Sequence, residues 1–132
     1  MKMPDHIPKE MLAPCGVLCL ACSAYLDKKK PCPGCHAPLE EQKRKSCMNC
    51  AKKICAIEKG HRWCFECIRF PCACIKDLSK RYAKNYDVDL VQNGMEAKEN
   101  MEAFLQALRI RFTCPECGGI MNQHQQKCSV CG

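Results

Sequence analysis

The sequence predicts a small metal-stabilised fold of mixed α+β and irregular structure, composed of a cysteine-rich zinc-knuckle module, a short helical spacer and a C-terminal zinc ribbon. Cysteine supplies 16 of the 132 residues. Ile, Leu, Val and Phe together supply only 24 of 132, about 18%, which is too few for an ordinary apolar core. Most cysteines occur as Cys-x2-Cys pairs, a spacing that lets two thiolates reach one metal ion.

The thiols are expected to be reduced. The N-terminal residues contain no apolar run long enough for a signal peptide, and no later segment is long and apolar enough to span a bilayer. We therefore expect a cytoplasmic protein without a membrane partner, in which cysteines do not form disulfides. Reduced cysteines at this density indicate metal ligation.

The formal net charge of +7 overstates how basic the metal-bound protein would be. Four thiolates around one Zn²⁺ carry a net charge of about −2. If all cysteines served four such sites, the total charge would fall to about −1. The basic composition therefore gives only weak support to nucleic-acid binding.

The cysteines divide the chain into three segments. Residues 1–74 contain twelve of them and form the expected multi-metal module, and residues 113–132 contain the other four. Residues 75–112 contain none and are expected to be helical and to pack on that module. The residues before Cys15 are expected to form a loose arm with His6 exposed to solvent.

The spacer predicts three helices. Pro71 suits a first helical turn, and apolar residues at helical spacing follow it: Ile75, Leu78 and Tyr82. Asp87 or Asp89 is expected to cap a short second helix, which Asn93-Gly94 would end. The third helix is predicted from an apolar stripe that should pack into the core: Met101, Phe104, Leu105, Leu108 and Phe112.

The C-terminal segment carries the most specific motif. Two Cys-x2-Cys-Gly turns follow one another, and glycine after the second cysteine supplies the positive φ that such a turn needs. A short zinc ribbon is predicted, with these four ligands: Cys114, Cys117, Cys128 and Cys131. A similar pattern predicts a second four-thiolate site, with Pro33-Gly34 in its second turn: Cys19, Cys22, Cys32 and Cys35.

The remaining eight cysteines can be grouped in three ways. The first grouping combines Cys47, Cys50, Cys64 and Cys67, and leaves Cys15, Cys55, Cys72 and Cys74. The second combines Cys50, Cys55, Cys64 and Cys67. The third combines Cys55, Cys64, Cys67 and Cys72. The expected content is accordingly three or four Zn²⁺ per chain.

The spacing Cys15-x3-Cys19-x2-Cys22 favours a different cofactor. It is the spacing that holds an iron–sulfur cluster in radical enzymes that use S-adenosylmethionine, but the chain is too short for their barrel. An iron–sulfur cluster within residues 15–74 is therefore the alternative to zinc, and it would make a redox or electron-transfer protein. Thiolate ligands alone do not distinguish the two metals.

Histidines and aromatic residues lie close to several cysteines. His36 and His124 are interpreted as hydrogen-bonding neighbours of a site rather than ligands, and His61 could serve the middle cysteines. Trp63, together with Phe65 and Phe70, is interpreted as covering the metal sites rather than stacking on bases.

The order of motifs resembles that of an uncharacterised prokaryotic family, the domain of unknown function 3795. The shared blocks are Ala13-Pro14-Cys15-Gly16, Cys19 with Cys22, Cys32-Pro33-Gly34-Cys35, Cys50-x4-Cys55 and Cys64-x2-Cys67-x2-Phe70-Pro71-Cys72. The resemblance continues into the helical segment and the ribbon, and it implies a zinc-binding cytoplasmic protein without an assigned activity. Cys47 and Cys74 lie outside the family's blocks; if neither is a ligand, His36 or His61 would complete a site.

No pattern of a catalytic triad, phosphate loop or paired carboxylates stands out, and a closed four-thiolate site has no coordination position for a substrate. The sequence therefore predicts a non-enzymatic interaction or adaptor module. A protein partner is favoured, and nucleic acid is the weaker alternative.

Overall fold

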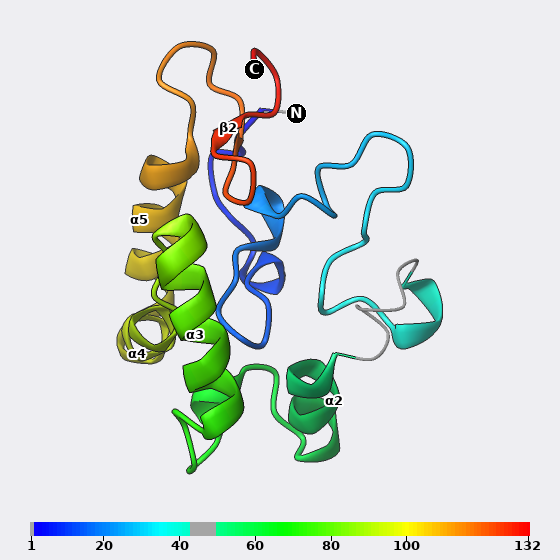
Figure 1. Ribbon diagram of the computed structural model, residues 1–132, viewed down its shortest axis with the longest axis vertical. Coiled ribbons are helices and arrows are strands. Elements are labelled where there is room, and N and C mark those ends of the chain that lie inside the picture. The colour runs from blue at the N-terminus through cyan, green and yellow to red at the C-terminus, as the bar shows by residue number, and fades with distance from the viewer. Residues whose placement is uncertain (1, 43–49) are drawn as a thin grey trace.

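A computed structural model describes residues 2–42 and 50–132. In this part of the chain the main elements are helices, with one two-stranded antiparallel sheet (Figure 1). The helices are α2 (Ala51–Glu58), α3 (Ala73–Tyr86), α4 (Leu90–Glu99) and α5 (Met101–Phe112). The strands are β1 (Met121–Asn122) and β2 (Lys127–Cys128). Short 3₁₀ turns are η1 (Lys9–Met11), η2 (Cys19–Ala21), η3 (Leu39–Glu41) and η4 (Cys64–Glu66).

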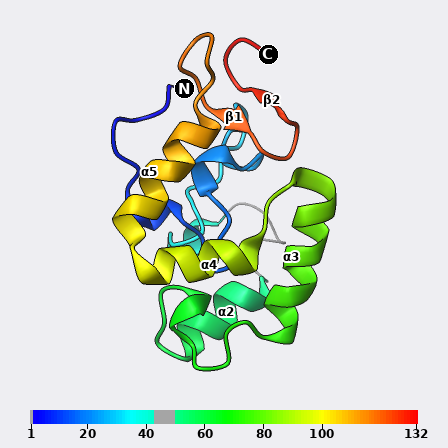
Figure 2. The ribbon, with the colours of Figure 1, turned by 90° about the vertical axis from the view of Figure 1, so that its left-hand side faces the viewer.

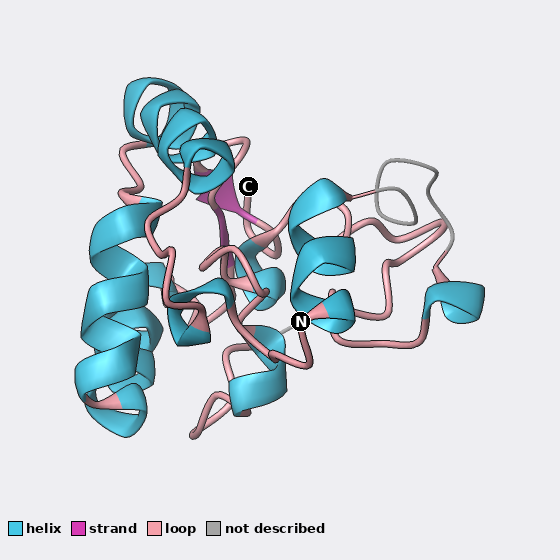
Figure 3. Ribbon diagram, turned by 90° about the horizontal axis from the view of Figure 1, so that it is seen from below, coloured by secondary structure: helices cyan, strands magenta, loops and turns pink. Residues whose placement is uncertain are grey.

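These elements agree with the expected small α+β class. Most of the described residues before α2 form loops, and within the described residues strand is confined to the C-terminal hairpin (Figure 3). In the described ranges, no helix has both the length and the hydropathy needed to cross a bilayer. The division into three segments stays a prediction, and residues of all three contribute to one apolar core.

Helices α3 and α5 begin and end close to where the sequence placed them. Cys72 is the N-cap of α3, so Pro71 lies just before the helix and not in its first turn as predicted; Ile75 is fully buried as part of the predicted face. The side chain of Asp89 accepts a hydrogen bond from the backbone N–H of Gln92 at 3.0 Å, which confirms the predicted cap of α4. Helix α4 packs against both α3 and α5 (Figure 2).

The predicted end of the second helix at Asn93-Gly94 is wrong, because α4 continues to Glu99. Gly94 lies inside α4, where its lack of a side chain lets the ring of Phe70 approach the helix closely. A Cβ atom at this position would lie 2.4 Å from Cζ of Phe70. The ring of Phe70 therefore occupies the space beside the helix that any larger residue would fill.

The apolar stripe of α5 packs into the core as predicted. Its buried members lie against residues of the N-terminal segment, Trp63 and Ile120 of the hairpin region. A smaller cluster joins α3 and α4 to the first cysteine loop and contains Ala13, Cys19 and Leu90. Helix and cysteine loops thus share their apolar surfaces.

The expectation of a loose N-terminal arm is wrong. Met3 and Ile7 are buried in the core, and the backbone N–H of Met3 donates to the carbonyl of Gly118 at 3.0 Å. His6 is exposed, as expected. The arm begins beside the ribbon, where Lys2 forms a β-bridge with Gly119, and then runs beside α5, whose Arg109 Nε donates to the carbonyl of Pro4 at 2.8 Å (Figure 2). Because the chain has few large apolar residues, the burial of Met3 and Ile7 is a substantial contribution to its core.

Gly94→Ala should destabilise the protein by about 1–3 kcal/mol, the usual cost of overpacking a filled site. Alanine is the better helix former by about 1 kcal/mol, so propensity alone predicts the opposite sign. Urea unfolding measures the change. Lys98→Ala, exposed on the same helix, is the control and should stay within about 0.5 kcal/mol of wild type. A Gly94→Ala protein as stable as wild type would contradict the Phe70 packing.

Candidate metal centres

The C-terminal hairpin brings four cysteines to one point. Cys114 follows α5, and its N–H donates to the carbonyl of Gly119 at 2.8 Å, closing the first knuckle. Gly118 adopts the positive φ expected from the sequence, at +73°. The strand pairing of Met121 with Cys128 then places the second knuckle opposite the first.

The sulfur atoms of this cluster have the spacing that a single ion requires. The Sγ atoms of Cys114 and Cys131 lie 3.8 Å apart, and those of Cys117 and Cys128 lie 3.5 Å apart. All four lie within 4.8 Å of one another. A tetrahedron with zinc–sulfur bonds of about 2.3 Å has edges of about 3.8 Å. In residues 2–42 and 50–132, this is the one group of three or more Cys, His, Asp or Glu ligand atoms gathered so closely.

Backbone amides surround the same sulfurs. The N–H of Gly119 donates to Cys117 Sγ at 3.3 Å, and the N–H groups of Val130 and Cys131 donate to Cys128 Sγ at 3.3 and 3.5 Å. The amides of Cys131 and Val130 lower the pKa of Cys128 to about 6. The neighbouring thiols, Cys128 first, raise the pKa of Cys131 to about 12. Four thiolates at this spacing need a cation among them.

The second predicted group, Cys19, Cys22, Cys32 and Cys35, lies in one region around η2. The N–H of Cys35 donates to Cys19 Sγ at 3.4 Å, and the N–H of Gly34 donates to Cys32 Sγ at 3.5 Å. Burial raises the pKa of Cys22, and the charges of Cys35 and Cys32 raise it further. The sulfurs are thus neighbours, in a wider arrangement than in the ribbon.

A cysteine-lined cavity of about 290 Å³ lies between α2, η4 and the start of α3. Its cysteines are Cys55, Cys64, Cys67, Cys72 and Cys74. This set contains all four cysteines of the third grouping considered above and three of the four in the second. Burial raises the pKa of Cys64 to about 12, with the charge of Cys72 as the next contribution in the same direction. Lys59 Nζ donates to Cys67 Sγ at 3.8 Å and supplies positive charge at the rim.

Cys15 lies between these two regions. Burial raises its pKa to about 12, and the thiols whose charges raise it further are Cys35, Cys50 and Cys64. Cys50 is the N-cap of α2. Cys47 lies outside the described residues, so the grouping that includes it stays a prediction.

Of the three histidines that lie close to cysteines, two are engaged in hydrogen bonds. His124 accepts from the N–H of Ser23 through Nδ1 at 3.1 Å and pairs with the hydroxyl of Tyr82 through Nε2 at 2.8 Å. Both of its ring nitrogens are used, which favours the non-ligand interpretation. His36 Nε2 lies 2.8 Å from the carbonyl oxygen of Leu12. His61 lines the cysteine cavity.

Trp63 is a core residue. It is buried, its indole N–H donates to the carbonyl of Leu12 at 2.9 Å, and its ring stacks on Phe65 with the centroids 5.6 Å apart. Since its ring faces are covered, Trp63 offers no platform for a base. This supports the interpretation that the aromatic residues cover the cysteine region.

The burial of Lys53 was not predicted from the sequence. This lysine of α2 is 2% exposed, and its Nζ has no hydrogen-bond partner among the described residues. A lysine beside another lysine is expected on a solvated helix face. The sequence signal that was available is the i, i+3 spacing to Ala56, which is also buried.

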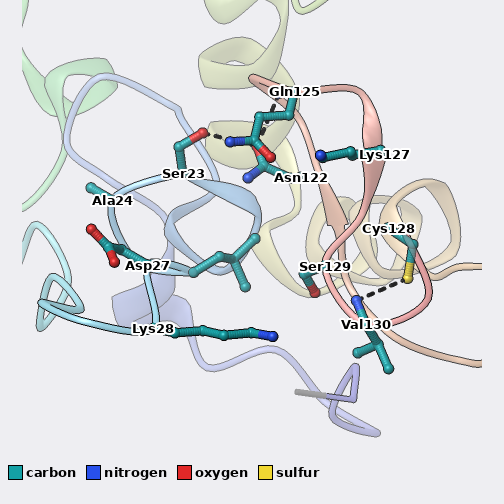
Figure 4. Close-up of a pocket in the computed structure, with 12 residues that line it drawn as sticks. Ser23, Ala24, Asp27, Lys28, Asn122, Gln125, Lys127, Cys128, Ser129 and Val130 are labelled. Carbon is teal, nitrogen blue, oxygen red and sulfur yellow. Dashed lines mark hydrogen bonds between the residues drawn. The ribbon is translucent and has the colours of Figure 1, made fainter.

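A further cavity of about 490 Å³ separates the ribbon from the loop that follows Cys22 (Figure 4). Lys28 and Lys127 line it on opposite sides, and Ser23 Oγ donates to Asn122 Oδ1 at 3.0 Å. Ser23 thus ties the two walls together beside His124.

His124 should make stability depend on pH. Burial lowers its pKa from the ordinary 6.5, so the unfolded chain binds the proton more tightly than the folded protein does. Its contribution to stability is complete above the unfolded pKa and is lost as the pH falls from that value through the lower folded pKa. The stability of wild type relative to His124→Gln should therefore decrease between about pH 7.5 and pH 5. Parallel urea titrations of both proteins measure this; a difference constant with pH would contradict it.

Comparison with known proteins places the chain in a family. Neither the curated proteins nor the solved structures gave a significant match. The model of one family, described as "Protein of unknown function (DUF3795)", matches residues 11–77. The match covers just over half of the chain and contains the cysteine blocks up to Cys74; α4, α5 and the ribbon lie beyond it. The chain is therefore a member of the DUF3795 family.

Proposed function

We propose that this protein is a cytoplasmic, zinc-binding interaction module without enzymatic activity. The observation that carries the proposal is the set of four ribbon sulfurs, whose separations of 3.5 and 3.8 Å suit one tetrahedral zinc ion. Four thiolates fill all positions of such an ion. The site is then closed to substrate, and its role is to stabilise the fold.

Zinc at the ribbon would stabilise more than the hairpin. The side-chain amide of Gln123 donates to the carbonyl of Leu18 at 2.9 Å, and its backbone N–H donates to the carbonyl of Ala21 at 2.9 Å. Ile120 is completely buried. Because the ribbon is bonded to the turn that carries Cys19, loss of its metal would also loosen the first cysteine module.

A protein partner is proposed on account of exposed apolar side chains. Ile68, which follows Cys67, is 100% exposed, and Ile110 of α5 is 69% exposed. Exposed large aliphatic residues favour a partner with apolar surface. Nucleic acid is the weaker candidate, since Trp63 is buried and metal binding would offset the basic charge.

A second candidate is an iron–sulfur protein, and the cysteine cavity favours it. Its thiols surround about 290 Å³, more room than a single ion needs, and they lie farther apart than the ribbon sulfurs. A cluster held by Cys55, Cys64, Cys67 and Cys72 would use that room. Iron with acid-labile sulfide in anaerobically purified protein supports this candidate, and colourless protein that contains only zinc contradicts it.

Elemental analysis of anaerobically purified protein tests the ribbon site. Wild type should contain three or four metal ions per chain, and Cys117→Ser should contain one zinc fewer because the site loses a thiolate. The control is Ser129→Ala, which lies between two of the ligands and keeps all four thiolates. Equal zinc content in wild type and Cys117→Ser would refute the ribbon site.

Retention on immobilised single-stranded RNA distinguishes the two kinds of partner. We expect the zinc-loaded protein not to be retained at low salt, where phosphate contacts are strongest. Metal-stripped protein, with its higher net charge, is the control for purely electrostatic adsorption. Salt-dependent retention of the zinc-loaded protein would contradict the proposal of a protein partner and would support nucleic acid as the partner instead.

A further inference from the structure

Lys53 is buried, and no hydrogen bond to a described residue compensates for the loss of water around its charged Nζ. It is 2% exposed, and its Nζ contacts no hydrogen-bond acceptor within the described residues. Carboxylate partners elsewhere in the described structure pair with arginines at the surface, such as Glu10 with Arg62. A buried ammonium without an anion nearby is strongly destabilising.

The titratable groups that share a cavity with Lys53 are Cys35, His36, His61 and Arg62. A cavity of about 130 Å³ is lined by Lys53 together with Cys35, His36 and His61. Lys53 and Cys35 line this cavity together, so the ammonium group and the thiol share one small enclosed space. Neither His36 nor His61 carries a negative charge in either protonation state, and Arg62 is a second cation. The nearby group able to carry one is the thiol of Cys35.

Cys35 connects this lysine to a complete set of thiols. Its N–H donates to Cys19 Sγ at 3.4 Å. The charges of Cys35 and Cys32 act on Cys22. These four cysteines form the second predicted site, and a metal held by four thiolates carries a net negative charge whether the metal is zinc or an iron–sulfur cluster.

We propose that Lys53 is the buried counter-charge of an anionic metal–thiolate centre formed by Cys19, Cys22, Cys32 and Cys35. The proposal rests on metal binding by this protein but concerns a site separate from the ribbon. The backbone amides of Gly34 and Cys35 donate to two of the sulfurs, and Lys53 supplies the positive charge that amides cannot. The lysine acts through the field at the thiolates and holds no metal itself.

Lys53→Met tests this proposal because it keeps the length of the side chain and removes the charge. In metal-loaded protein, a chelator should remove metal from the N-terminal centre about 10- to 100-fold more readily, the usual effect of losing an outer partner of a metal site. Metal retention at the ribbon should not change. The control is Lys52→Met, the adjacent and less buried lysine, which should behave as wild type.

A double-mutant cycle with Cys35→Ser gives the sharper result. Where the centre is intact, Lys53→Met should lower the melting temperature. In the Cys35→Ser background, the charge has lost its anion, so the same substitution should raise the melting temperature. In a Cys131→Ser background, which leaves Cys35 and its three partner cysteines unsubstituted, Lys53→Met should lower it again. This sign reversal needs no assumption about which metal is bound.

Three outcomes are decisive. A Lys53→Met protein that is more stable than wild type and retains metal equally well overturns the proposal, because Lys53 is then an unpaired charge. The same holds if its effect has the same sign in the Cys35→Ser background. Wild-type protein that contains no metal when purified anaerobically overturns the proposed function itself, which the other two outcomes leave intact.

Discussion

The mutual repulsion of closely packed thiolates is the constraint on which this structure depends. Four sulfurs within 4.8 Å of one another cannot all ionise without a cation, and as neutral thiols they would add little to stability. The structure supplies partial compensation throughout: amide N–H groups at Cys117 and Cys128, and Lys59 at Cys67. Each of these groups lowers the free energy of a thiolate but does not neutralise the total negative charge of the sulfurs. The residual charge is what a bound metal would balance.

Sulfur also takes part in the apolar core. Cys19 packs with Ala13 and Leu90, and Cys32, Cys114 and Cys128 are buried as deeply as many aliphatic residues. A chain with few large apolar residues thus extends its core with the side chains that line its proposed metal sites. In consequence, metal binding and packing are not separate contributions here, because a ligand that moves to release metal also leaves the core.

Sequence patterns correctly predicted those features of the fold that depend on interactions between residues close together in the chain. The α5 stripe and the Asp89 cap each depend on a few neighbouring residues, and so does the positive φ of Gly118. Predictions were wrong where a distant residue decides. From the sequence, Gly94 was predicted to end the helix, because nothing in the local pattern shows that Phe70 packs against it. The burial of Met3 and Lys53 likewise depends on segments far away in sequence, and periodicity carries no information about those.

The contact between the N-terminal arm and the ribbon has a consequence for how the chain acquires its structure. Lys2 and Cys117 are 115 positions apart, so the arm is synthesised long before the segment on which it docks. Until α5 and the ribbon have emerged from the ribosome and the ribbon has closed, Met3 and Ile7 lack part of the apolar surface that covers them. The apolar core of residues 1–74 therefore stays partly exposed until the ribbon has formed. Supply of metal to the last twenty residues would then set the time at which the whole molecule becomes compact.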